Sequence, residues 1–98
     1  MKDILANLNK AFENRIRLGI MSVLMVNDWM EFNSLKELLE TTDGNLASHL
    51  KALEEKGLIK VEKQFIGRKP NTSYSITGEG THLFKQHLKA LEDLINAQ

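Results

Sequence analysis

The outer face of residues 43–56 carries small polar side chains where a surface helix usually carries long charged ones. Leucines at helical spacing mark the opposite, buried face of this segment: Leu46, Leu50 and Leu53. Asn45 can pair with the edge of an adenine through two hydrogen bonds, and Ser48 can donate to or accept from several bases. Gly44 permits close approach of the backbone, and the free N–H groups of a first helical turn suit a phosphate. We therefore expect Gly44, Asn45 and Ser48 to contact DNA in a major groove.

The neighbouring residues of the same segment have less specific roles. His49 lies at the edge of the buried face, where we expect it to pack while its outer nitrogen reaches toward a phosphate. Lys51 points outward, and both contact with the DNA backbone and simple solvation are compatible with its position. Asp43 is expected to be the helix N-cap, because a carboxylate there interacts favourably with the helix dipole. The alternative for Asn45 and Ser48 is an ordinary solvated surface.

Arg68 and Lys69 are the second group that suits DNA. They lie in the run 66–71, whose Gly, Pro and Asn residues favour a turn between two strands, and Lys63 lies further back on the predicted hairpin. An arginine at a hairpin tip can enter a minor groove or bind phosphates. We expect all three cations to contact DNA. The alternative is a polar hairpin whose cations have no ligand.

Helical periodicity predicts the elements that precede these groups. A short helix over residues 1–12 is followed by a longer helix that Asn14 caps. Residues 29–32 should be extended and pair with the hairpin as a third strand. Ser34 and Glu37 form the capping-box pattern of a further helix. Its expected buried face consists of leucines: Leu35, Leu38 and Leu39.

The period of the apolar residues changes from helical to alternating after Gly57, which suits the C′ position of the preceding helix. Thr77 is expected to cap a last helix with a wide apolar stripe. This order of elements predicts an α+β, mostly helical fold: a winged helix-turn-helix with a two- to three-stranded wing and an additional C-terminal helix. We expect one domain over residues 1–98 with these parts: terminal helices at 1–12 and 78–96, a helix-turn-helix at 34–57 and a wing at 58–77.

The composition is that of an ordinary globular chain, with 42% hydrophobic and 27% charged residues, and its formal net charge is zero. A DNA-binding surface must therefore come from segregation of charge. We expect the cations to share one side: Lys51, Lys60, Lys63, Arg68 and Lys69. The acids should lie elsewhere: Glu37, Glu40, Glu54, Glu79, Glu92 and Asp93.

Several classes of function find no support in the sequence. There is no cysteine, no apolar run long enough to span a membrane, and an acid at Asp3 where a secretory signal would be basic. His82 and His87 are spaced about 140° apart on a helix, which is poor geometry for a shared metal. Arg15 and Arg17 are expected to pair with acids. No phosphate-binding loop or catalytic set is visible, so we expect a cytoplasmic protein that is not an enzyme and needs no cofactor or metal.

The run TDGNLASHLKALEEKGLIKVEKQFIGRKPNTSYSITGEG resembles the winged-helix domain of MarR- and ArsR-like bacterial and archaeal transcriptional regulators. The resemblance covers essentially the whole chain. It implies a homodimer that binds a pseudo-palindromic operator in double-stranded DNA, with Asn45, Ser48, Lys51 and Arg68 near the DNA. Many relatives have a basic residue at the position of Ser48. The cysteine ligands of the metal-sensing branch are absent, so that chemistry is not implied.

The resemblance also implies that the terminal helices form the dimer interface, and the last helix carries more apolar surface than one small domain needs. The expected interface residues are Ile4, Leu5, Leu8, Leu83, Leu88, Leu91, Leu94 and Ile95. One alternative is a winged-helix module that binds protein without binding DNA. Another is a switch in which a small-molecule effector binds at the dimer interface. Its pocket would be lined by Met21, Met25, Trp29 and Met30, although such a stripe is more often plain core.

Overall fold

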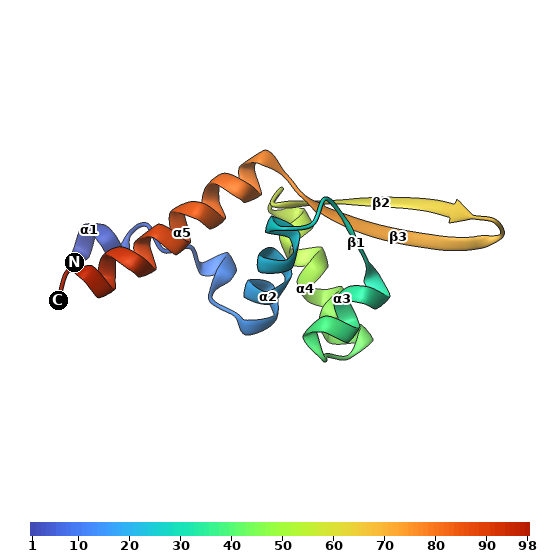
Figure 1. Cartoon of the computed structure of the whole chain (residues 1–98), viewed down its shortest axis with the longest axis horizontal. Helices are drawn as coiled ribbons and strands as arrows, with labels where there is room; N and C mark the ends of the chain where they lie inside the picture. The colour runs from blue at the N-terminus through green and yellow to red at the C-terminus, as the bar shows by residue number, and fades with distance from the viewer.

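The terminal helices and the wing lie at opposite ends of an elongated molecule (Figure 1). The computed structural model describes residues 1–98, with extents of 55 × 25 × 21 Å. The elements in chain order are α1 (Lys2–Leu5), the 3₁₀ helix η1 (Lys10–Phe12), α2 (Arg15–Met25), β1 (Met30–Glu31), α3 (Phe32–Leu39), α4 (Asp43–Glu55), β2 (Ile59–Ile66), β3 (Lys69–Ile76) and α5 (Gly78–Asn96). The predicted fold class, a winged helix with a C-terminal helix, is confirmed. No helix is long and apolar enough to cross a membrane.

The core lies where α2, α3 and α4 meet the base of the sheet and the start of α5. The three leucines predicted for α4 are buried, as are Ile20, Met21 and Leu24 of α2 and Phe84 of α5. Because only one face of α4 is needed for this packing, its other face stays free for a ligand.

The three strands form an antiparallel sheet in the order β1-β3-β2, so the predicted third strand is confirmed. Ile66 pairs with Lys69, which leaves Gly67 and Arg68 as a two-residue turn, and Gly67 has the positive φ of 66° that such a turn requires. Pro70 and Asn71 were expected in the turn, but they lie within β3 opposite β2. The tip is therefore tighter than predicted.

Helix caps decide where the helices begin and end. Asn14 caps α2 by accepting hydrogen bonds from the N–H groups of Ile16 and Arg17, and Thr77 caps α5, both as expected. Gly57 follows α4 with a φ of 74°, which confirms the predicted C′ position.

Two predicted caps of the helix-turn-helix are wrong. The chain turns helical directly after β1, so α3 begins at Phe32 and Ser34 lies inside the helix. The helix α4 is capped by Thr42, whose hydroxyl accepts from the N–H of Asn45, and Asp43 is its first helical residue. Leu38 was expected to be buried but is 61% exposed. In this short helix Leu35 already faces the core, and Leu38 lies on the side that no other element covers.

The N-terminal helix is much shorter than expected. Its regular part ends at Leu5, and a 3₁₀ helix follows in which the Asn9 side chain accepts from the N–H of Ala11. The main-chain N–H of Asn9 donates to Nδ1 of His87 at 3.0 Å, which joins this segment to α5. Residues 1–12 therefore lie along α5 as an irregular segment (Figure 1).

One glycine sets how α5 meets the sheet. A Cβ at Gly80 would overlap the main-chain carbonyl of Leu58, so only glycine permits this close approach. Gly78, one residue after the cap, faces open space.

Candidate nucleic-acid interface

The exposed face of α4 begins with the residues that the sequence singled out. Gly44, Asn45, Ser48 and Lys51 are all exposed, and none of them contributes to the core. Asp43, which would repel phosphate, forms an ion pair with Lys36 of α3 at 2.9 Å. That pair offsets the carboxylate charge at the end of the helix that would approach DNA and joins the two helices of the motif.

The amide of Asn45 is oriented by a neighbouring hydroxyl. Its Nδ2 donates to Oγ1 of Thr41 at 2.9 Å. This bond uses only one of the two N–H groups of the amide, so the second N–H and the carbonyl oxygen remain available. Pairing with an adenine edge requires one donor and one acceptor of this kind.

His49 is half-buried, and its ring contacts Arg17 of α2. The Nη1 of Arg17 lies 3.2 Å from Nδ1 of His49, and its Nε donates to the carbonyl of Ala11 at 2.7 Å. No acid forms the ion pair predicted for Arg17, because its guanidinium group contacts the Ala11 carbonyl and His49 instead. Desolvation and the neighbouring Arg17 charge lower the pKa of His49. A neutral His49 whose Nδ1 accepts from Arg17 carries its proton on Nε2, so it can offer a neutral donor to a phosphate.

A groove separates α4 from the near face of the wing. Lys51 and Glu54 line it from α4, and Lys63 lines it from β2. The predicted charge segregation is wrong in two places. Glu54 shares this groove with the two lysines, and Lys60 lies on the other face of β2, where its nearest acid is Glu62 at 3.9 Å. Alternation along a strand causes the second error, since residues three apart point to opposite faces.

The wing tip presents apolar as well as basic side chains. Arg68 and Lys69 are exposed, as expected, and beside them Phe65 is 74% and Ile66 is 62% exposed. Sequence reasoning assigned no role to these two residues. The sequence signal that could have identified them is a pair of apolar residues next to the turn, where the hairpin projects beyond the core.

The terminal helices leave an apolar stripe uncovered. Leu5 of α1 and Leu88, Leu91 and Ile95 of α5 are exposed. The remaining predicted interface residues are half-buried: Ile4, Leu8, Leu83 and Leu94. Of these, Leu83 packs against the core of the domain.

The methionines proposed to line an effector pocket do not form one. Met21 is fully buried, and Met25 and Met30 pack against the same core. Trp29 differs from them because it is exposed and lines a groove on the outer face of the wing sheet.

The chain is similar to known DNA-binding proteins over most of its length. A family model described as a winged helix DNA-binding domain matches residues 16–95. An uncharacterized protein of Methanocaldococcus jannaschii is 40% identical over 79 residues, which are 81% of this chain and 86% of that protein.

Two solved structures share the arrangement. A transcriptional regulator homologue from Pyrococcus horikoshii superposes with a TM-score of 0.85 at 34% identity, over 98% of this chain and 93% of that one. A protein from Enterococcus faecalis described as a transcriptional regulator of the MarR family superposes with a TM-score of 0.67 at 25% identity, over 97% of this chain and 78% of that one. The predicted resemblance to MarR-like regulators is therefore confirmed.

Proposed function

This chain belongs to the family of winged helix DNA-binding domains, and we propose that it is a homodimeric transcriptional regulator of pseudo-palindromic operators. In this proposal α4 enters the major groove, while the tip of the wing lies on the backbone or in the minor groove. Such a regulator acts in the cytoplasm, where the DNA is. Its predicted likeness to ArsR-like regulators stays a prediction.

The exposed face of α4 is the observation that supports this function best. Its first turns present the short residues Gly44, Asn45 and Ser48 to solvent. A helix with short polar residues at its N-terminal end can lie close to base edges, and its free N–H groups suit a phosphate. Lys51 and Lys63 lie further along the groove, where the DNA backbone would pass.

Dimerisation through the terminal helices is supported by the apolar stripe on α1 and α5. Leu88, Leu91 and Ile95 are exposed and recur at helical spacing on one face of α5, and an apolar stripe of this kind favours a second copy of the chain. A two-fold axis there would place two recognition helices about 34 Å apart, the distance between successive major grooves. The wings would then lie at the two outer ends, since each wing is opposite the termini (Figure 1).

Two substitutions test base reading and backbone binding separately. We would select bound genomic fragments with the purified protein and measure Kd for the best fragment and for its single-base variants. Asn45→Ala should lower the preference for one position of each half-site by about 1–3 kcal/mol. Arg68→Ala should weaken binding to all sequences alike and reduce its salt dependence. If neither substitution changes binding to any fragment, the proposed DNA-binding surface is wrong.

The exposed apolar residues at the wing tip favour a second candidate function, a module that docks on protein. Phe65 and Ile66 would supply an apolar anchor that such an interface requires. The same selection distinguishes the two functions, because a protein-binding module would enrich no DNA fragment over bulk genomic DNA.

A further inference from the structure

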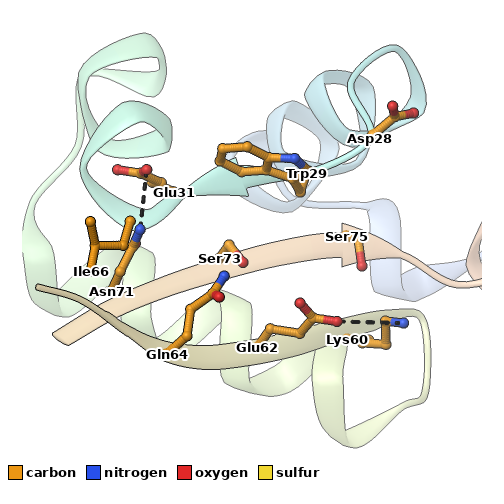
Figure 2. Close-up of a pocket in the computed structure, with 10 residues that line it drawn as sticks. All are labelled: Asp28, Trp29, Glu31, Lys60, Glu62, Gln64, Ile66, Asn71, Ser73 and Ser75. Carbon is orange, nitrogen blue, oxygen red and sulfur yellow. Dashed lines mark hydrogen bonds and ion pairs between the residues drawn. The ribbon is translucent and has the colours of Figure 1, made fainter.

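The outer face of the wing sheet, which points away from α4, forms a groove of about 450 Å³ (Figure 2). Residues from all three strands and from the loop before β1 line it. Val61 and Lys63 point to the other face of β2, toward α4. A ligand in the outer groove would therefore leave the proposed DNA surface free.

A row of three residues crosses the sheet at the centre of this groove. Ser73 of β3 is paired with Glu31 of β1 on one side and with Glu62 of β2 on the other. Residues directly opposite each other in antiparallel strands point to the same face. Since neighbouring strands are about 4.8 Å apart, the main chains of the two glutamates are about 10 Å apart, with the serine midway.

The hydroxyl at the centre of this row has no partner within the protein. Ser73 is 7% exposed, and its side chain makes no hydrogen bond, although it lines the groove. Every fully buried side-chain polar atom in the structure has a partner. The Ser73 hydroxyl therefore reaches the floor of the groove, where it can accept a hydrogen bond from a bound group.

The charges around this hydroxyl are mainly negative. The carboxylate of Glu31 is held by Nδ2 of Asn71 at 3.2 Å, and Asp28 adds a further acid at one end of the groove. Lys60 is the only cation there, and its distance of 3.9 Å from Glu62 is at the long limit of an ion pair. The groove thus keeps an excess of negative charge with an ordered carboxylate beside the free hydroxyl.

An aromatic ring lies beside these acids and the serine hydroxyl. Trp29 is 58% exposed, and its indole lies between Glu31 and Asp28 over the sheet (Figure 2). A large exposed tryptophan flanked by acids is the arrangement that attracts organic cations, because the ring face is electronegative. No three acidic or histidine side chains are close enough to hold a metal ion, so a monatomic cation fits this groove less well than an extended one.

We propose that this groove binds a linear aliphatic di- or polyamine. One ammonium group lies between Glu31 and Glu62 and donates a hydrogen bond to the Ser73 hydroxyl. The methylene chain runs along the indole of Trp29, and a second ammonium group reaches Asp28. The site spans β1 and the wing, so the bound amine links the wing to the strand from which α3 begins.

The intrinsic fluorescence of the protein gives a direct test without DNA. Trp29 is the only tryptophan of the chain, so its emission reports this groove alone. We would titrate the full chain with spermidine, putrescine and butylamine at constant ionic strength, and repeat the titrations by calorimetry. Saturable binding is expected, tightest for spermidine and weakest for the monoamine.

Charge-neutralising variants identify the binding groups. Glu31→Gln keeps the acceptor for Asn71 while it removes the charge, and both Glu31→Gln and Glu62→Gln should weaken spermidine binding about two- to fivefold. Glu92→Gln, an exposed acid on α5, is the matched control and should leave it unchanged. The proposal is overturned if neither method detects saturable binding, if all three amines bind alike, or if both groove variants bind as the wild type does. Because DNA is absent, these outcomes are independent of the proposed regulatory function.

Discussion

The two lysines Lys60 and Lys63 allow a sharp test of which face of the wing meets DNA. They lie on the same strand, three residues apart, but on opposite faces. Lys63 lines the groove beside α4, whereas Lys60 faces the outer groove near Glu62. Replacing either residue by alanine removes the same charge from the same strand. The effect on DNA binding should nevertheless differ, because only one of them faces the proposed DNA surface.

The expected magnitude follows from counterion release. Each phosphate that a protein neutralises contributes about 0.9 to the slope of log K against log salt concentration. Lys69 pairs with Ile66, which lines the outer groove, so it lies on the outer face and adds nothing to this slope. A homodimer that uses Lys51, Lys63 and Arg68 of both protomers should have a slope of about −5. Its affinity should then fall about 10³-fold between about 50 and 200 mM salt. Lys63→Ala should change the slope to about −4, and Lys60→Ala should leave it near −5.

Fluorescence anisotropy with a labelled operator fragment measures this slope directly. Far-ultraviolet circular dichroism should be the same for both variants, since both lysines are exposed and neither belongs to the core. Equal changes of slope for the two variants, or a larger change for Lys60→Ala, would refute the assignment of the DNA-facing side. A wild-type slope near zero would refute phosphate binding by these cations altogether.

Three further predictions concern packing, protonation and assembly. Gly80→Ala should lower the unfolding free energy by about 3 kcal/mol in urea denaturation, because the new methyl group meets main chain, whereas the matched variant Gly78→Ala should be close to neutral. Desolvation lowers the pKa of His87 below its ordinary value of 6.5, so the unfolded chain binds more protons between the folded-state pKa and 6.5. The free energy of unfolding should therefore fall as pH is lowered through that window. His87→Asn, which retains an acceptor for the N–H of Asn9, should reduce this pH dependence. An unchanged pH dependence would contradict the assignment of this effect to His87. Leu91→Glu should convert the proposed dimer into a monomer in light scattering, and a variant that keeps the wild-type mass would exclude this interface.

The periodicity of the apolar residues was sufficient to predict the fold and most of the buried helix faces. The spacing of Leu46, Leu50 and Leu53 matches the helical repeat, and all three are buried. This buried face could be predicted without knowledge of any tertiary contact. The cap bonds of Asn14 and Thr77 were predictable for a similar reason, since each side chain accepts from an N–H two or three residues further on. Local physics determines these features, so the sequence reveals them. Thr77 also donates to the distant carbonyl of Gly57, a contact that the sequence does not show.

Two of the errors, those at Ser34 and Arg17, arise where a distant partner decides between local alternatives. Ser34 has the capping-box pattern, yet pairing of β1 with β3 moves the helix start to Phe32. Arg17 could have met an acid, but the way α2 packs on α4 brings it to His49. Neither partner is near in sequence, and the sequence alone does not contain the angle at which two helices meet.

The zero net charge is compatible with DNA binding because the sheet sorts charges by strand face. Within β2, Lys60 and Glu62 face the outer groove, while Lys63 faces α4. Phosphates within a Debye length of about 10 Å would sense this local arrangement more strongly than the total charge. The acids of the outer face would therefore take no part in DNA binding. Their excess near an exposed indole and an unpaired hydroxyl suits the proposed site for organic cations. The alternation that turns Lys63 toward the proposed DNA surface therefore also creates the acidic groove on the opposite face.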